Sequence, residues 1–417
     1  MNSFLKTCAA TALGLLTACG STTDPGTGGT RPAALQALPR ALTASEQKVI
    51  GAANDFSFSL FRQVSSAQQG ANVFTSPLSA SMALGMTMNG AANATYDQMR
   101  AALAFGGASE TDINQGYKSL IALLRGLDAS VDFRIANSVW YRTGFPFNQT
   151  FLDASATWFD AQVTALDFAS PSAVTTINTW VSSATAAKIP TIVDQISSDQ
   201  VMLLINAIYF KGSWRDKFDA TKTIAAPFHG IAGDRSAKLM HRNATIAYLG
   251  TADFDAADLP YGNSAFSMTV LLPKAGKNIE TIASGIQGTD WATWAAQFHD
   301  ATMDLYLPRF TFSWERTLND DLKALGMRDA FAAGGADFTR MSPRGRELYI
   351  SFVKQKTFVD VNEEGTEAAA ATSVGVSVTS APVPVVIRVD RPFLFVIRER
   401  LSGTVLFIGK VVTLPSP

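Results

Sequence analysis

The sequence predicts an α+β protein with large, mostly antiparallel β-sheets. Helical patterns come first in the chain, strand-like runs dominate its C-terminal half, and no unit recurs at a fixed period. Regular alternation of strands and helices, which would indicate a parallel α/β fold, does not occur. With 47% hydrophobic and 17% charged residues in a chain of 417, a sizeable core can form.

The first helix is predicted to begin at residues 43–46 (TASE), which have the capping-box pattern of a helix N-terminus. Apolar residues then recur at helical spacing up to Val64. A second helix, rich in Ala and Met, is predicted directly after Ser76-Pro77. The pattern of residues 318–327 indicates another helix later in the chain.

Six apolar runs predict strands. The run VMLLINAIYF (201–210) is continuously apolar and is expected to be buried on both faces. LYISFV (348–353) continues into KQKTFVDVN, so we expect one long strand there. The other runs are SMTVLLP (267–273), MDLYLPRF (303–310), FLFVIRE (393–399) and TVLFIGKVV (404–412).

Residues 1–18 have the pattern of a secretory signal peptide. One basic residue, Lys6, precedes an apolar stretch too short to span a bilayer, and small residues stand directly before Cys19. This pattern is typical of a bacterial lipoprotein, in which Cys19 would become the lipid-modified first residue. A plain signal peptide cut near Ala18, or a Cys at this place by chance, are the alternatives.

Residues 19–42 are dominated by Gly, Thr and Pro, which predicts a flexible tether before a globular body over residues 43–417. The protein is therefore expected to be exported and either anchored to the bacterial cell envelope, at the outer membrane, or extracellular. The formal net charge is −1 and no basic block occurs, so nucleic-acid binding has no electrostatic support.

Residue types that carry common enzyme chemistry are scarce. His229, His241 and His299 lack the spacing of a helical metal site, and the only two Cys, Cys8 and Cys19, lie in the first twenty residues. Gly-x-Ser-x-Gly and Gly-rich phosphate motifs are missing as well. We therefore expect no metal or other cofactor, and a conventional enzyme is disfavoured. A hydrolase whose triad comes from distant positions is kept as a minor alternative.

The most unusual stretch is EEGTEAAAATSVGVSVTSAPVPVVI (363–387), which has no charged residue after Glu367. From Thr366 its residues alternate with the period of a β-strand, with apolar residues mostly on one face and polar ones on the other. Pro382 and Pro384 end the pattern, because proline cannot donate ladder hydrogen bonds. The stretch indicates a loop that can become a strand. One more sheet strand, or a simple exposed loop, are the alternatives.

From about residue 45 to the C-terminus, the chain resembles the serpin family. VNEEGTEAAAAT (361–372) is similar to the reactive-loop hinge of an inhibitory bacterial serpin. Four further blocks match in order, NVFTSPLSASMALGMTMNGAANAT (72–95), LINAIYFKGSWRDKF (204–218), LPYGNSAFSMTVLLP (259–273) and RPFLFVIRERLSGTVLFIGKV (391–411). The resemblance implies a serpin fold with three β-sheets, eight or nine helices and an exposed reactive-centre loop over about 363–387.

The resemblance also implies roles for individual residues. The reactive bond falls at Thr379–Ser380, after the fourteenth residue beyond Gly365, and Val378–Thr379 is the runner-up. Positions beneath the inserting strand correspond to Ser76, Ser79, Asn206, Trp214 and Gln355. The hinge comprises Glu363, Gly365, Thr366, Glu367, Ala368, Ala369, Ala370 and Ala371.

One position departs from the family pattern. The family usually places a His where this chain has Gln355, eight residues before the first hinge Glu. A Gln side chain can donate and accept hydrogen bonds, so we expect it to bond toward Asn206 and Ser79. We therefore expect the loop still to insert as a strand, with the ease of insertion altered by Gln355.

A protease inhibitor, not an enzyme, is what the resemblance implies. In the family, a serine protease attacks the loop and forms an acyl-enzyme, and insertion of the cut loop into the main sheet then traps it. The residues around Thr379 include no Arg or Lys, so the expected partner of this monomeric protein is an elastase-like or subtilisin-like protease. A non-inhibitory serpin that binds or carries a ligand, and an inhibitor of a cysteine protease, are the alternatives.

Overall fold

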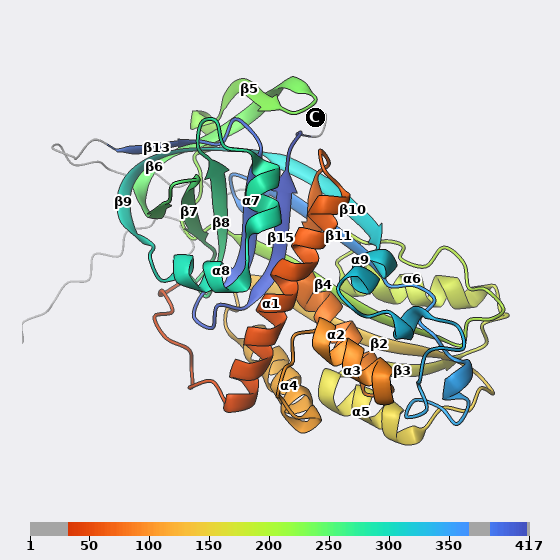
Figure 1. Ribbon diagram of the computed structural model, residues 1–417. Helices are drawn as coiled ribbons and strands as arrows, with labels where there is room; N and C mark the ends of the chain where they lie inside the picture. The colour runs from red at the N-terminus through yellow and green to blue at the C-terminus, as the bar shows by residue number, and fades with distance from the viewer. Residues whose placement is uncertain (1–31, 367–383, 415–417) are drawn as a thin grey trace, which may run out of the picture. The chain divides into compact units, whose positions relative to one another are not determined.

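The computed structural model describes residues 32–366 and 384–414 (Figure 1). Its first helix, α1 (Ala44–Ala67), begins as the sequence predicts. The Thr43 side chain accepts a hydrogen bond from the Glu46 N–H, and the Glu46 carboxylate accepts one from the Thr43 N–H. Two N–H groups that the helix itself leaves unpaired are thereby satisfied, and the predicted capping box is confirmed.

One sheet has six strands in the order β10-β11-β12-β4-β2-β3. Its strands are β2 (Val131–Arg142), β3 (Ala161–Leu166), β4 (Met202–Ser213), β10 (Phe310–Thr317), β11 (Lys354–Asn362) and β12 (Gly365–Thr366). Only β2 and β3 are parallel neighbours. Because β4 and β11 both run antiparallel to the short β12 between them, they are parallel to each other.

The other sheet has nine strands, in the order β1-β15-β14-β8-β7-β6-β9-β13 with β5 also paired to β6. The 18-residue β6 (Gly233–Gly250) pairs with β5 near its start and with β7 at its end, so it joins two parts of this sheet. The three expected sheets are thus hydrogen-bonded as two in the part of the chain that the structure describes. The other strands are β1 (Val73–Thr75), β5 (Ile224–Gly230), β7 (Phe254–Pro260), β8 (Phe266–Pro273), β9 (His299–Pro308), β13 (Val385–Arg388), β14 (Phe393–Glu399) and β15 (Val405–Val411).

Nine α-helices lie within the described ranges, and the predicted α+β class is confirmed. α2 (Pro77–Met88) contacts β4 of one sheet and β15 of the other, so the main hydrophobic core lies around it, between the sheets. α6 (Ser172–Ala184) covers the opposite face of β2 and β4 and closes a smaller core (Figure 1). The remaining helices are α3 (Asn93–Ala102), α4 (Glu110–Gly126), α5 (Gln149–Phe159), α7 (Ile279–Gly285), α8 (Gly288–Ala295) and α9 (Asn319–Ala324).

Two strand predictions were wrong in their bounds. Residues 348–353 form no strand, and β11 begins only at Lys354. Leu348, Ile350 and Val353 of this run pack on the core. Its backbone makes single hydrogen bonds, from the Ile350 N–H to the Ala330 carbonyl in a 3-10 helix and from the Leu318 N–H, just before α9, to the Val353 carbonyl. The run 303–310 is divided at Arg309, because β9 and β10 belong to different sheets.

Residues 32–42, the end of the predicted tether, lie against the body in this structure. The Leu35 N–H donates to the Asn263 carbonyl, and the side chains of Leu35, Leu38 and Leu42 pack on the core. Arg40 forms an ion pair with the buried Glu46 at 2.5 Å. The predicted signal peptide and Cys19 lie outside the described residues.

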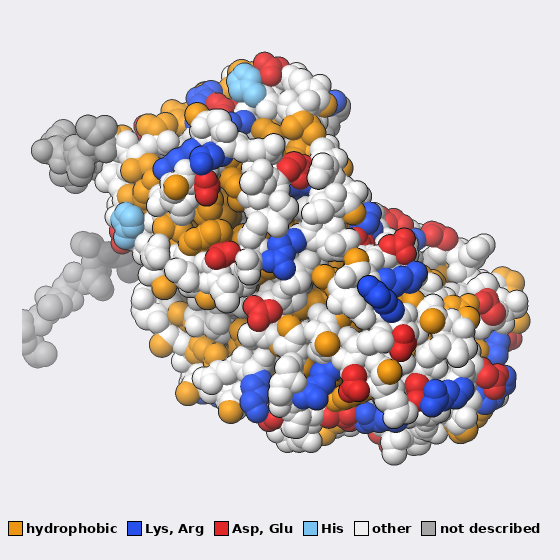
Figure 2. All heavy atoms as spheres, viewed as in Figure 1, with side chains coloured by type: hydrophobic (Ala, Val, Ile, Leu, Met, Phe, Trp, Pro, Cys, Tyr) orange, Lys and Arg blue, Asp and Glu red, His pale blue; other side chains and the backbone are white. Residues whose placement is uncertain are grey.

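Charged side chains of both signs are interspersed on the face of the molecule shown in Figure 2. None of the helices within 32–366 and 384–414 has the length and apolar composition needed to cross a membrane. The same residues contain no group of three or more His, Cys, Asp or Glu side chains arranged to hold a metal ion.

Candidate functional site

β12 holds the hinge between two strands of the six-stranded sheet. Thr366 pairs with Val361 of β11 on one side and with Gly212 of β4 on the other, and Gly365 pairs in the same way with Asn362 and Ser213. Beyond Thr366, no strand lies between β4 and β11 in the described part of the chain. We call this gap between the facing edges of β4 and β11 the slot.

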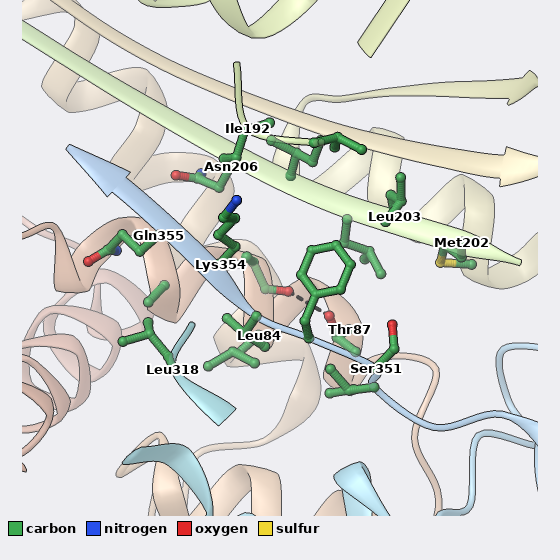
Figure 3. A pocket seen from close by; sticks show the side chains of 18 of the residues that line it. Leu84, Thr87, Ile192, Met202, Leu203, Asn206, Leu318, Ser351, Lys354 and Gln355 are labelled. Atoms are coloured by element: carbon green, nitrogen blue, oxygen red, sulfur yellow. Dashed lines mark hydrogen bonds between the residues drawn. The ribbon is translucent and has the colours of Figure 1, made fainter. Parts of the chain in front are cut away.

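A cavity of about 160 Å³ lies along the slot. Figure 3 views it with Asn206, Leu203 and Met202 on β4 and with Lys354 and Gln355 on β11. Helix α2 contributes further lining residues, including Ser79 and Thr87. Unpaired strand edges of this kind are sites where another extended segment can add.

A glycine is required at the end of the slot where β12 lies. Gly365 has a φ of +154°, and a Cβ atom there would lie 2.0 Å from the Gly212 carbonyl oxygen. An L-amino acid with a side chain would therefore clash with β4. The sequence-based role of Gly365 as the pivot of the hinge has a physical basis in this close approach.

Aromatic packing supports the same end of the slot. Trp214 is buried, stacks on Tyr261 with ring centroids 4.5 Å apart, and donates from its indole N–H to the Asn362 carbonyl at 2.8 Å. The Tyr261 hydroxyl lies 2.6 Å from the Thr366 hydroxyl, and both residues are buried. Burial raises the pKa of the Tyr261 phenol, so the phenol stays neutral and can share a proton with Thr366.

Charge pairs fix the acidic turn between β11 and β12. The Glu363 carboxylate, 7% exposed, is paired with Arg309 at 2.5 Å and accepts a hydrogen bond from the Thr223 hydroxyl. Glu364 is paired with Lys217 at 2.5 Å. The carbonyls of the same two glutamates accept from the Trp214 and Phe218 N–H groups. The turn is held from both its side chains and its backbone.

Gln355 bonds elsewhere than expected. Its amide oxygen accepts from the Ser76 N–H at 3.0 Å, and its amide nitrogen donates to the Ser76 carbonyl at 2.7 Å. This pair of bonds connects β11 to the start of α2. The structure shows no bond from Gln355 to Asn206 or Ser79 among the described residues.

Asn206 has partners of its own. Its amide nitrogen donates to the Asn137 side chain at 2.5 Å, and the Ser79 hydroxyl lies 3.4 Å from its backbone carbonyl. Its side-chain oxygen is buried and has no hydrogen-bond partner among the described residues. A buried acceptor without a donor is costly, so this atom favours any state that brings a donor into the slot.

The structure brings together part of the predicted site. Glu363, Gly365, Thr366 and Trp214 meet at one end of the slot, and Ser76, Ser79, Asn206 and Gln355 lie near its middle. The rest, Glu367, Ala368, Ala369, Ala370, Ala371, Val378, Thr379 and Ser380, lies outside the described residues.

Sequence reasoning missed several supporting side chains. Tyr261, Arg309, Thr223 and Asn137 were not predicted, although each contacts a predicted residue. Lys217, which pairs with Glu364 of the same turn, was not predicted either. Tyr261 lies inside one of the family-like blocks, residues 259–273, and Lys217 lies inside another, residues 204–218. Thr366, the partner of Tyr261, is 105 positions away, and no local pattern encodes such a pair.

A sheet with an open slot, whose one end already holds the beginning of a loop, defines a class of proteins that can add a strand from their own chain. The family model for serpins, described as serine protease inhibitors, matches residues 51–414. The chain belongs to the serpin family.

Individual relatives share both sequence and fold with this chain. Leukocyte elastase inhibitor of Homo sapiens is 34% identical over 372 residues, covering 85% of this chain and 96% of the relative. The crystal structure of the thermophilic serpin tengpin in its native state superposes with a TM-score of 0.82 at 30% identity, covering 92% of this chain and 98% of that one. Human thyroxine-binding globulin in complex with thyroxine gives a TM-score of 0.80 at 26% identity, covering 89% of this chain and 100% of the globulin.

Proposed function

We propose that this protein inhibits a protease by suicide trapping, and that the slot between β4 and β11 receives its own cleaved loop. The position of β12 carries the proposal, because Gly365 and Thr366 already lie between the two strands as the first residues of an incoming strand. The cavity beyond them offers space for the residues that follow.

The register of β12 predicts how the rest of the loop would insert. β12 is antiparallel to both of its neighbours. Each residue after Thr366 would therefore pair with the residue one position earlier on each neighbour, counted back from Val361 on β11 and from Gly212 on β4. The even-numbered residues, mostly Ala, Thr and Val, would then face α2 and the core. Thr372, six residues on, would lie between Gln355 and Asn206, where its hydroxyl would supply the donor that the Asn206 side-chain oxygen lacks.

Insertion would release enough free energy to move a bound protease. About a dozen new backbone hydrogen bonds, at about 0.5–1.5 kcal/mol each, would stabilise the inserted state by on the order of 10 kcal/mol. That is comparable with the whole free energy of unfolding of a domain. Side chains as small as those of the four alanines after Glu367 would enter the sheet without large rearrangement.

The trap would form at the acyl-enzyme stage. The protease serine would attack the carbonyl carbon of Thr379, forming an ester and releasing the α-amino group of Ser380. Insertion would then carry the esterified protease along the sheet and distort its active site before water hydrolyses the ester. The trap requires only an acyl-enzyme, so a cysteine protease that forms a thioester is an alternative target.

Small uncharged residues around Thr379 support an elastase-like or subtilisin-like target, since a trypsin-like pocket would find no Arg or Lys to bind. The similarity to an elastase inhibitor supports the same choice. The similarity to thyroxine-binding globulin favours a second candidate, a serpin that binds a ligand without trapping a protease. The small hinge residues Gly365 and Thr366, already placed in the sheet, weigh against this second candidate.

The cell envelope is the proposed place of action, through a lipid on Cys19 after removal of residues 1–18. The Leu16-Thr17-Ala18-Cys19 pattern supports this proposal. Cys19→Ala in the bacterial host should release the protein from membrane pellets and abolish palmitate labelling. Cys8→Ala is the matched control, because Cys8 would leave with the signal. Equal labelling of wild type and Cys19→Ala would contradict the lipid anchor.

The trapping proposal is tested by incubating the purified protein with elastase or subtilisin and running the mixture on a denaturing gel. A covalent band at the summed mass of the protease and the cleaved protein is expected. Protease inactivated at its serine by an acylating reagent should give no band. Cleavage of the loop without any such band, across a panel of serine and cysteine proteases, would overturn the proposal.

A further inference from the structure

Tyr261 is held rigidly at the end of the slot. It is fully buried, its ring stacks on Trp214 with centroids 4.5 Å apart, and it meets Phe210 edge to face with centroids 5.0 Å apart. A Cβ atom on Gly212 would lie 3.0 Å from the same ring, so the ring lies directly beneath the β4 backbone where β12 pairs. Packing around the ring therefore holds the hydroxyl in place next to β12.

The hydroxyl reaches the residue that leads the hinge into the sheet. It lies 2.6 Å from the Thr366 hydroxyl, and Thr366 is 4% exposed. A hydrogen bond between two buried hydroxyls is stabilising, and removing one partner leaves the other unsatisfied. The backbone of Thr366 is also paired on both sides, with Val361 and with Gly212.

We propose that Tyr261 is a positioning residue that holds Thr366 between β4 and β11, so that insertion of the loop begins from an ordered two-residue seed. The consequence for trapping rests on the proposed function. After cleavage, insertion competes with hydrolysis of the acyl-enzyme, and a seed already in register shortens the first step of insertion. Without the hydroxyl, the seed would leave the sheet more often and more loops would be hydrolysed.

The ring and the hydroxyl of Tyr261 can be separated by mutation. Tyr261→Phe keeps the stacked ring and removes only the hydroxyl, while Thr366→Val keeps the shape of Thr366 and removes the partner. Tyr117→Phe is the matched control, because Tyr117 is also fully buried and its hydroxyl is bonded to Ser81, on helices away from β12. A purely structural role would give Tyr261→Phe and Tyr117→Phe the same consequences.

The seed itself is measured by amide hydrogen exchange of the uncleaved protein, in peptides that contain residues 361–366. Tyr261→Phe should raise the exchange rate of this segment about fivefold, the change that a loss of about 1 kcal/mol gives. Tyr117→Phe should leave this segment unchanged. Unchanged exchange in a folded Tyr261→Phe variant would overturn the proposal.

The effect on trapping is measured as the number of inhibitor molecules consumed per protease inactivated. Tyr261→Phe and Thr366→Val should each raise this number several-fold, and the double variant should be no worse than the more affected single one, because both remove the same bond. Independent, multiplying effects, or faster exchange with unchanged consumption, would overturn the positioning role. If the wild type traps none of the proteases tried, the proposed function fails, and the exchange measurement alone decides whether Tyr261 holds Thr366.

Discussion

The two ends of the slot differ in how completely their polar groups are satisfied. Where β12 lies, the hinge has backbone partners on both sides, Glu363 and Glu364 have cationic partners, and Thr366 has the Tyr261 hydroxyl. In the middle, β4 and β11 face a cavity, and the side-chain oxygen of Asn206 has no donor among the described residues. The sheet is therefore hydrogen-bonded across the slot where β12 lies, and among the described residues it is open where that strand would continue.

Of the substitutions that test the difference between the two ends of the slot, Thr366→Arg should have the largest effect on inhibition, because it places an uncompensated charge at a buried position between two strands. The seed cannot remain in the sheet, and the protein should be cleaved as a substrate with inhibition reduced at least about 100-fold, the factor that a loss of about 2.7 kcal/mol gives. Inhibition assays with elastase or subtilisin measure this. Thr311→Arg, at an exposed position of β10 in the same sheet, is the control and should keep full inhibition. Full inhibition by Thr366→Arg would refute the hinge assignment.

Glu363→Gln tests the charge pairing at the closed end. It removes the charge that meets Arg309 and should lower the free energy of unfolding by about 1–2 kcal/mol, measured by urea denaturation. Glu347→Gln is the control, since Glu347 and its partner Arg344 are both more than half exposed, so that solvent screens their attraction and the loss of stability should be clearly smaller. Equal losses in the two variants would show that the turn holds no special charge pair.

Gln355→His tests whether residue 355, in the middle of the slot, is buried, through the pH dependence of the free energy of unfolding. The Gln355 amide does not titrate, whereas a buried His has its pKa lowered by loss of hydration below the unfolded value of about 6.5. The variant should therefore keep its stability above about pH 6.5 and lose up to about 1.4 kcal/mol per pH unit below it. Urea denaturation at pH 5.5 and 7.5 measures this, with the exposed Gln162→His as control. The same pH dependence in both variants would contradict a buried Gln355.

Glu46 lies away from the slot and should affect stability without affecting trapping. Its hydrogen bond with Arg40 lowers the pKa of the Glu46 carboxyl from 4.5 to about 2. The stability that the Glu46 carboxylate contributes is therefore complete above pH 4.5 and is lost as the pH falls toward 2, and solvent screening at the exposed Arg40 reduces it. Acid denaturation of wild type and Glu46→Gln should converge over this range, with the inhibitor consumed per protease equal in both. A change in consumption would mean that the slot is not the only control of trapping.

The sequence was sufficient where the determining interactions are local. The capping box at Thr43 and Glu46 follows from neighbouring residues and the geometry of a helix N-terminus. The run 348–353 looked like a strand because its composition is apolar, but its backbone bonds lead to residues 318 and 330 instead of to a neighbouring strand.

The slot itself could not be predicted from local patterns. It depends on the spacing of β4 and β11, which lie about 150 positions apart in the chain, and on Gln355 bonding to Ser76, 279 positions away. The serpin resemblance supplied the residues near these places, but it gave Gln355 other partners than the structure does. The role of Tyr261 depends on its contact with Thr366, which only the folded structure shows.

The central claim, that the slot is a place reserved for the loop, is tested most directly by the thermal stability of the protein before and after a single cut in residues 367–383. If the cut loop inserts between β4 and β11, the gain of on the order of 10 kcal/mol should raise the midpoint of thermal unfolding by on the order of 10 °C or more. Calorimetry of the intact and the cleaved protein, with the cut located by N-terminal sequencing, measures it. An unchanged or lower midpoint after the cut would contradict the claim and favour a serpin that binds a ligand without inserting its loop.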